Sequence, residues 1–461
     1  MGNTVRKVLF LIVSLALITS LFAESKTIAS LEVTGKTIAG TEVYENEIEE
    51  QYQFYLSIYG SFDPLFEEPY VRAYVLNDLL RERVIEHLAN LEKLSSEEFV
   101  ERYSSVDEND MRDYYKNNRE ELMKDEYVDI DYAVFSTQEE AQKFYADALK
   151  YGFDKALEMV ENAEEVKYDS YDGLKKSETN DIFVDVLFGK YDSKIRIQYT
   201  DNGSFVFFIR NHNDLSTFEK FKESPRYSEI ADNLGKEKLN SYIDNNIKSR
   251  NINVRTSDDY LIWLDFVRGK EPRKILSEYL PKVVDKNKLV STNNTWLIAG
   301  VISAIEDAKA YDEFKTEYES SVSKLYNMGY KTFPVLSRMR QFDNSEKVRL
   351  EYNVELSKIL INYINEGDVM SVFQYIYKNI SELEELTSSS DKNTRLKAME
   401  YLYYMSALLG EDEKAESYYE SIISEEPHYE FELDINEILE NRQPGAEPDV
   451  YEGEDTEEDS E

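Results

Sequence analysis

VDIDYAVF (residues 128–135) alternates apolar and polar side chains, and it interrupts a chain whose other segments have mostly helical periodicity. Such alternation over about 4–8 residues is typical of a half-buried β-strand. Two further strands are predicted at 195–199 and 205–209, joined by a DNG turn that is typical of a hairpin. We therefore predict a small α/β unit at residues 127–215, in which the first and last strands pair in one sheet.

Two segments of this unit are less regular. The polar stretch 164–181 is expected to form a loop, and the apolar stretch 182–188 is expected to form a short helix or strand. Thr137 is a good helix cap, and Ala141 and Phe144 start an apolar stripe after it, so a helix is predicted between the first strand and the loop.

The segments on either side of the α/β unit are predicted to be helical. Ile48, Tyr52, Tyr55 and Ile58 recur at helical spacing, which predicts a helix that ends at Gly60. The fold class is therefore mainly α with a small α/β insert. The expected domains are a signal peptide (1–23), an N-terminal helical lobe (24–126, completed by 216–256), the α/β unit (127–215), a helical repeat region (257–440) and a disordered acidic tail (441–461).

The N-terminus has the layout of a secretory signal. Arg6 and Lys7 precede the apolar run 8–22, and Ala23 follows it. Cleavage after Ala23 would leave a soluble protein in the periplasm or an equivalent extracytoplasmic space, whereas an uncleaved signal would tether it by its N-terminus. No later segment is long and apolar enough to span a bilayer, so no membrane span is expected after signal cleavage.

The composition limits the classes of partner. The net charge of −40 repels nucleic acid and anionic lipid, and the absence of Cys excludes disulfides and thiol chemistry. Tyr is unusually frequent at 36 copies, with 22 Phe beside it. Because Tyr combines an apolar face with a polar tip, these rings suit a surface that binds varied partners. The alternative is that they fill the cores.

The motifs of common enzyme chemistries are missing. His87, His212 and His428 are the only histidines, and none has the spacing of a metal site. The sequence contains no nucleophile elbow, no phosphate-binding loop and no dinucleotide fingerprint. Neither a metal nor another cofactor is therefore expected.

The order of elements up to residue 254 resembles the parvulin-type foldases of cell envelopes, the SurA and PrsA kind. The matching stretches are LEVTGKTI and EVYENEIEEQY at the N-terminus, SVDENDMRDYYKNNREELM before the α/β unit, VDIDYAVFST with QEEAQKFYADA inside it, and LGKEKLNSYIDNNIKSRNINV after it. The resemblance implies a chaperone lobe made from both ends of this region, with a parvulin-like domain inserted.

The parvulin-like part departs from the family at the residues that carry its activity. Parvulins have a His in the first strand and another in the last, and the corresponding positions here are Tyr132 and Phe205. An X–Pro amide rotates over a barrier of about 18–20 kcal/mol, and a shaped polar pocket is needed to lower it. We therefore predict little or no prolyl isomerase activity and assign no catalytic residue.

A second resemblance is to tetratricopeptide repeats. In LKAMEYLYYMSALLGEDEKAESYYESIISEEP, Leu402, Gly410, Ala415, Tyr419 and Pro427 lie where such a repeat has a core residue, a turn, a small contact, an aromatic and a stop. Because one repeat cannot bury its own apolar face, neighbouring helix pairs must stack. An irregular helical bundle is the alternative for this region.

These features predict an extracytoplasmic chaperone that binds unfolded or partly folded exported polypeptides through aromatic surfaces, without isomerase activity. The expected contacts lie at a helix end and in the loop between Pro64 and Pro69: Tyr52, Tyr55, Tyr59, Phe62, Phe66 and Tyr70. Two alternatives stay open. The repeat-like region could dock one specific envelope protein as a scaffold, or the chain could be a divergent active isomerase.

Overall fold

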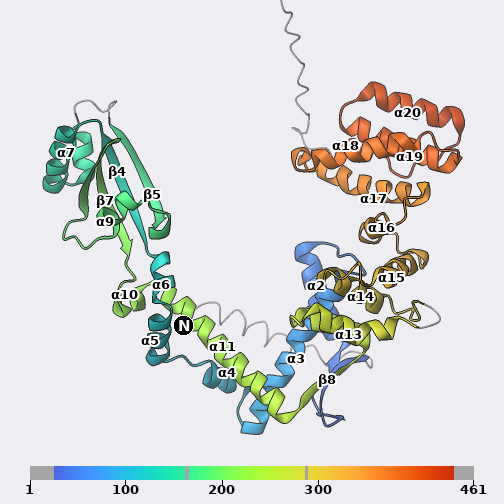
Figure 1. Cartoon of the computed structure of the whole chain (residues 1–461), viewed down its shortest axis with the longest axis horizontal. Coiled ribbons are helices and arrows are strands. Elements are labelled where there is room, and N and C mark those ends of the chain that lie inside the picture. Colours follow the sequence, from blue (N-terminus) through green and yellow to red (C-terminus); the bar gives the residue numbers. More distant parts are fainter. Residues whose placement is uncertain (1–24, 161–165, 286–288, 441–461) are drawn as a thin grey trace, which may run out of the picture. The chain divides into compact units, whose positions relative to one another are not determined.

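The computed structural model describes residues 25–160, 166–285 and 289–440, so the predicted signal (1–23) and acidic tail (441–461) lie outside the described residues. The chain is mainly helical with two small antiparallel sheets, which confirms the predicted fold class (Figure 1). It divides into two compact units, one formed by residues 1–83 with 253–461 and the other by residues 84–252. This division cuts through the predicted N-terminal lobe, whose boundaries stay a prediction.

The first unit begins with a small sheet. Its central strand β1 (Thr27–Val33) is paired with β2 (Lys36–Thr37), β3 (Val43–Tyr44) and the returning strand β8 (Ile252–Thr256). The buried Thr41 hydroxyl accepts a hydrogen bond from the Leu31 amide at 3.1 Å, which closes the turn before β3. Helix α2 (Glu45–Tyr59) starts directly after β3 and stops at Gly60, whose φ of +80° favours glycine. Helix α3 (Glu68–Glu92) follows a short loop.

The rest of this unit is a run of helices. Those from α17 to α20 lie side by side (Figure 1). Short turns join several of them, as at Gly410, whose φ is +77°. The helices are α12 (Asp258–Val267), α13 (Pro272–Val283), α14 (Thr295–Asp307), α15 (Lys315–Asn327), α16 (Phe333–Met339), α17 (Glu346–Asn365), α18 (Val369–Leu386), α19 (Lys392–Leu408), α20 (Asp412–Glu425) and α21 (Ile435–Glu440).

A buried carboxylate attaches the segment before α21 to α19. Glu400 is fully buried and accepts hydrogen bonds from the hydroxyls of Tyr404 and Tyr429, both at 2.8 Å, and from the Glu432 amide. The Lys397 ammonium lies 2.8 Å from the same carboxylate. A buried charge is tolerated only when it is paired and hydrogen-bonded in this way.

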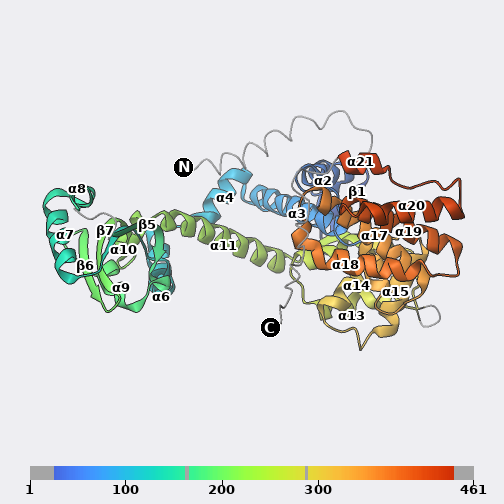
Figure 2. The same ribbon diagram turned by 90° about the horizontal axis from the view of Figure 1, so that it is seen from above.

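The second unit contains a four-stranded sheet in the order β5-β4-β7-β6, with every neighbour antiparallel. The strands are β4 (Tyr127–Phe135), β5 (Lys167–Lys175), β6 (Ile195–Thr200) and β7 (Gly203–Asn213). Helices α7 (Gln138–Tyr151) and α8 (Phe153–Glu158) pack on one face through Phe144 and Phe153, and α9 (Asp181–Phe188) packs on the other. Figure 2 shows α7 and α8 beside the sheet. The pairing of the first and last predicted strands is thus present as β4–β7.

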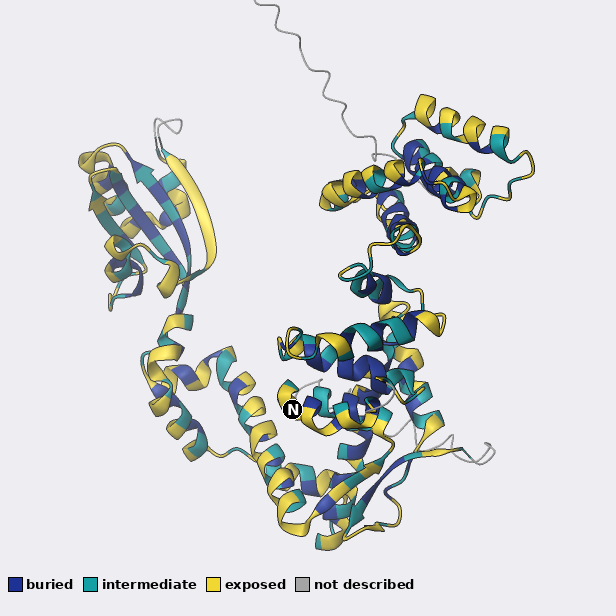
Figure 3. Cartoon of the chain, turned by 45° about the vertical axis from the view of Figure 1, so that its right-hand side comes forward, coloured by how far each residue is buried: buried dark blue, intermediate teal, exposed yellow. Residues whose placement is uncertain are grey.

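Strand β5 lies where a loop was expected, and that expectation was wrong. Its sequence KYDSYDGLK has eight exposed residues of nine, so neither face gives the alternating burial that predicts a strand. It is an edge strand, coloured as exposed along its length in Figure 3. Backbone pairing with β4, from Tyr127↔Lys175 to Val134↔Lys167, is what makes it a strand.

Helices complete the second unit. Phe218 and Phe221 of α10 (Phe218–Glu223) pack with Met111 and Tyr115 of α5 (Glu108–Asn117). The long α11 (Pro225–Arg250) contacts α4 (Ser96–Ser104) at Gly235, where a Cβ would lie 2.5 Å from the Ser104 carbonyl oxygen. A short helix α6 (Arg119–Leu122) leads into β4. Among the described residues, no helix has both the length and the apolar character needed to cross a membrane.

The Glu400 cluster gives a stability prediction. Glu400→Ala should lower the free energy of unfolding of the first unit by about 2–4 kcal/mol, because two tyrosine hydroxyls and one amide lose a buried acceptor. Urea unfolding followed by tryptophan fluorescence measures this, since Trp263 and Trp296 both lie in that unit. The exposed Glu413→Ala is the matched control, with an expected change below about 0.5 kcal/mol. Equal effects of the two substitutions would contradict the assigned role of Glu400.

Candidate functional site

The loop between α2 and α3 is held in shape by its own acidic side chains. The Asp63 carboxylate accepts hydrogen bonds from the amides of Leu65 (3.0 Å) and Phe66 (2.9 Å). The Glu67 carboxylate in turn accepts one from the Asp63 amide at 2.8 Å. This reciprocal arrangement is the capping pattern of a helix start, and it explains why the chain turns into α3 here. Leu65 is fully buried and anchors the loop.

The C-terminal helices of the same unit hold the loop from outside. The indole of Trp296 on α14 donates a hydrogen bond to the Pro64 carbonyl oxygen at 3.0 Å. The guanidinium of Arg338 on α16 lies 4.0 Å from the ring centroid of Phe66, and its charge is paired with Glu306 at 2.8 Å. The loop is therefore fixed at three points, and the orientation of Phe66 is set by a cation–π contact.

A shallow groove of about 460 Å³ opens at this loop. Four of the six residues predicted as peptide contacts line it, namely Tyr59, Phe62, Phe66 and Tyr70. Tyr59 comes from the last turn of α2 and Tyr70 from the first turn of α3, so the groove lies between the two helix ends. The remaining lining residues are Ser61, Glu67 and Val71.

The groove continues into a wider aromatic surface along α2 and α3. Tyr55 is at its centre, with its ring centroid 6.2 Å from those of Phe54, Tyr59 and Tyr74. Tyr59 is 68% exposed and Phe54 is 59% exposed, although side chains of this size are usually buried. We call this the α2–α3 aromatic surface, comprising Phe54, Tyr55, Ile58, Tyr59, Phe62, Phe66, Tyr70 and Tyr74.

Tyr52 lies beneath this surface and not on it. Its side chain is only 5% exposed, with the Phe62 ring 6.0 Å away and the Arg72 guanidinium 4.0 Å from its ring centroid. Arg72 is held there by Glu49 (2.8 Å) and Glu68 (2.7 Å). Tyr52 therefore supports Phe62 from below, which corrects its placement among the direct contacts.

Three residues of the surface were not singled out from the sequence: Phe54, Ile58 and Tyr74. Ile58 recurs at helical spacing with Ile48 and Tyr52, which are buried, yet it is 55% exposed. Phe54 and Ile58 are four residues apart and so share a face, as do Tyr70 and Tyr74 on α3. Two aromatic or large apolar pairs at this spacing, on helices joined by a short loop, were the available signal.

Tyr132 and Phe205, the two positions that the predicted resemblance aligns with the parvulin histidines, lie in one aromatic cluster of the second unit. Tyr132 on β4 and Phe205 on β7 are on the sheet face that α9 covers. Phe183 of α9 has its ring centroid 4.9 Å from Phe205 and 5.5 Å from Phe207, and Tyr132 is 6.2 Å from Phe207. All four are apolar rings in mutual contact, so this face presents no imidazole at those positions.

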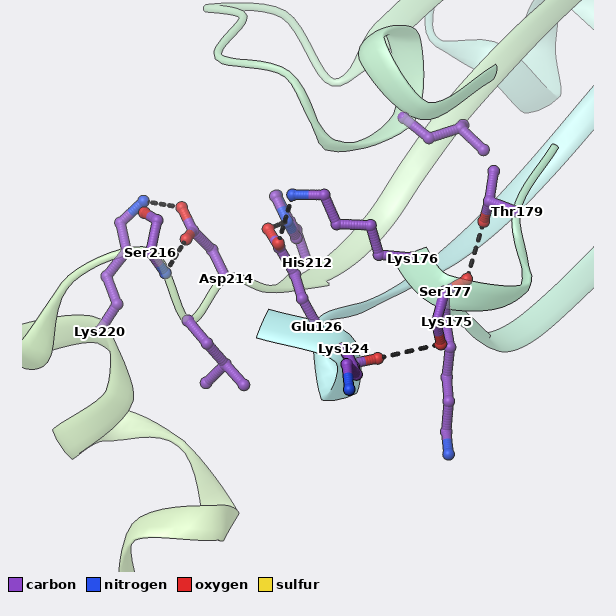
Figure 4. A network of polar contacts seen from close by, with 12 residues as sticks. Lys124, Glu126, Lys175, Lys176, Ser177, Thr179, His212, Asp214, Ser216 and Lys220 are labelled. Atoms are coloured by element: carbon purple, nitrogen blue, oxygen red, sulfur yellow. Dashed lines mark hydrogen bonds and ion pairs between the residues drawn. The ribbon is translucent and has the colours of Figure 1, made fainter. Parts of the chain in front are cut away.

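His212 takes part in a polar network at the base of the sheet (Figure 4). Glu126, just before β4, is 2% exposed, and its carboxylate is 2.8 Å from His212 Nε2 and 2.8 Å from the Lys176 ammonium. His212 is near the end of β7, so the network joins the points where the chain enters and leaves the sheet. Among the described residues, no set of three or more His, Asp or Glu side chains is arranged to hold a metal ion.

Comparisons of the chain with protein-family models, with curated proteins and with solved structures find no match. Fold and site therefore define the class only coarsely, as a mainly helical protein with a small antiparallel sheet unit and an exposed aromatic surface.

The aromatic cluster around Tyr132 leads to a prediction about catalysis. The full-length chain should not accelerate cis–trans isomerisation of a proline-containing peptide, because both imidazoles are absent and the Tyr132 hydroxyl is the only polar side-chain group at these two positions. A protease-coupled peptide assay measures this. An acceleration that Tyr132→Ala removes, while the exposed Tyr151→Ala on α7 leaves it intact, would contradict the prediction.

Asp214 lies close to this network, and its lowered pKa predicts that the stability of the second unit depends on pH. Burial acts to raise the pKa of its carboxyl group, but hydrogen bonds from Lys220 and Ser216 outweigh it and lower the pKa from 3.8 to about 2. In the unfolded chain the group takes up its proton near pH 4, whereas the folded chain keeps the charge to about pH 2. The stabilisation is therefore complete above pH 4 and is lost as the pH falls towards 2.

Asp214→Asn should remove this dependence and cost the second unit about 1–2 kcal/mol at neutral pH. Hydrogen exchange of the β7 and α10 amides between pH 2 and 6 measures it, because both tryptophans lie in the other unit. The exposed Asp201→Asn is the matched control. If the two variants had the same pH profile, the linkage to Asp214 would be refuted.

Proposed function

We propose that the protein is an extracytoplasmic chaperone that binds unfolded or partly folded exported polypeptides through the α2–α3 aromatic surface, without isomerase activity. The observation that carries this proposal is the exposure of Phe54, Tyr59 and Tyr74 around a groove that the surrounding helices hold in shape. A contiguous exposed apolar patch marks an interaction site. The extracytoplasmic location rests on the signal-like sequence of residues 1–23.

The chemistry of the surface suits varied and weakly held ligands. Phenol and phenyl rings offer large contact areas at a small loss of side-chain entropy, and burial of apolar area contributes about 25 cal/mol per Å². The groove is shallow, so it admits side chains of an extended chain without enclosing them. Such contacts do not depend on one sequence, which is what a chaperone requires.

A second candidate function uses the helical run of the same unit. Met370, Phe373 and Tyr377 of α18 are exposed and share one face, and the rings of Phe373 and Tyr377 are 4.6 Å apart. This face favours the scaffold alternative, in which the helices α17–α20 dock one specific envelope protein. A divergent active isomerase is the least supported function, given the cluster at Tyr132 and Phe205.

The two surfaces can be separated by matched triple variants. One carries Phe54→Ala, Tyr59→Ala and Tyr74→Ala, and the other carries Phe373→Ala, Tyr375→Ala and Tyr377→Ala; all six residues are exposed helix residues. Alanine keeps the helices intact. The wild-type chain should suppress aggregation of a chemically denatured test protein at near-stoichiometric ratio, measured by light scattering.

The first variant should require about tenfold more protein for the same suppression, because exposed aromatic anchors dominate binding energies. The second variant should behave as wild type. Loss of activity in the second variant alone would move the function to α18, and a wild-type chain that suppresses no aggregation would rule out the chaperone.

A further inference from the structure

The chain segment that forms most of the aromatic surface is acidic. Residues 45–71, which include α2 and the groove loop, contain seven carboxylates and no Lys or Arg. Of the nearby cations, Arg72 is paired with Glu49 and Glu68 and Arg338 is paired with Glu306, while the charge of Arg81 acts on Asp78. The field over the surface is therefore negative.

Three exposed acidic residues lie at the ends of the aromatic rows. Glu50 is one helical turn before Phe54 on α2, and Asp78 is one turn after Tyr74 on α3. Both belong to the same end of the surface, because Tyr55 of α2 contacts Tyr74 of α3. The negative charge of Asp78 also reaches Tyr55, whose pKa is raised by burial first and then by its charged neighbours. Glu67 lies at the opposite end, inside the groove.

The distance between the two acidic ends fixes the length of a matching ligand. From Glu50 to Tyr59, which lines the groove together with Glu67, the helix rises about 13 Å at 1.5 Å per residue. An extended chain covers this distance in about four residues at 3.3 Å each. A ligand side chain in the middle of that span faces the rings, and those at its ends face carboxylates.

We propose that the α2–α3 aromatic surface selects extended polypeptide segments in which an aromatic or large apolar side chain lies between two Lys or Arg residues about four positions apart. This selectivity rests on the proposed chaperone function and names its preferred ligand. Rings bind the central side chain, and the acidic ends attract the cations and repel acidic segments. A cation close to a Tyr or Phe ring gains a further cation–π contribution.

Fluorescein-labelled peptides test this with the full chain at low salt. The probe GGKAFAKGG has both cations and the ring, GGQAFAQGG has only the ring, and GGKAAAKGG has only the cations. By fluorescence anisotropy, the first should bind about tenfold more tightly than either of the others, since each exposed ion pair contributes modestly. Its advantage over GGQAFAQGG should fall in 0.5 M salt, where the Debye length is short.

A variant that lacks the three acidic side chains is the second test of the proposal. The variant Glu50→Gln, Glu67→Gln and Asp78→Asn should bind the two Phe peptides equally. The control Glu413→Gln, Glu416→Gln and Glu420→Gln removes the same net charge from exposed positions of α20 and should keep the difference. Equal losses in both variants would overturn the proposal, because the attraction would then come from the total charge of the chain.

The three peptides give one result if the cation preference is wrong and another if the aromatic surface does not bind polypeptides. If GGQAFAQGG bound as tightly as GGKAFAKGG, the cation preference would be wrong while the aromatic surface would remain a binding site. If GGKAAAKGG bound as tightly as the ring-containing probe, the surface would act only as a negative field, and the inference would fail. If no Phe peptide bound at all, the proposed function itself would be refuted.

Discussion

The exposure of the aromatic rings depends on how the loop between α2 and α3 is fixed. Rings of this size would lose water contact by collapsing into the unit, and burial at about 25 cal/mol per Å² favours that collapse. Leu65 occupies the interior in their place, while Trp296 and Arg338 hold Pro64 and Phe66 from the C-terminal helices. The N-terminal helices thus depend on a part of the chain more than 200 residues away in sequence.

Within the α2–α3 pair, the residues that stabilise the fold differ from those that form the exposed surface. Ile48 and Tyr52 on α2 face inward and are buried, and Arg72 lies over Tyr52 with both of its acidic partners. Phe54 and Ile58 face outward on the same helix. A helix of 3.6 residues per turn can bear two apolar stripes of this kind, one that stabilises the fold and one left free for a ligand.

The sequence predicted a strand correctly where that strand is both covered on one face and paired through its backbone. β4, β6 and β7 are each covered on at least one face, so their alternation predicted them and their pairing. β5 has no such cover, and only its backbone pairing with β4 makes it a strand. On α2 the helical period was correctly read, but a period reveals that two stripes exist and not which one the rest of the chain will cover. Tyr52 is buried beneath Phe62 and Arg72, whereas Ile58 is left exposed.

The α/β unit keeps its polar contacts and its aromatic packing in different places. Its two central strands are clamped at their base by Glu126, His212 and Lys176, a network that costs desolvation and is retained only because every charge has a partner. At the positions where the resemblance places imidazoles, Tyr132 and Phe205 instead pack with Phe183 of α9 and Phe207. Polar groups thus hold the strands together at the base of the sheet, and aromatic rings pack on the face that α9 covers.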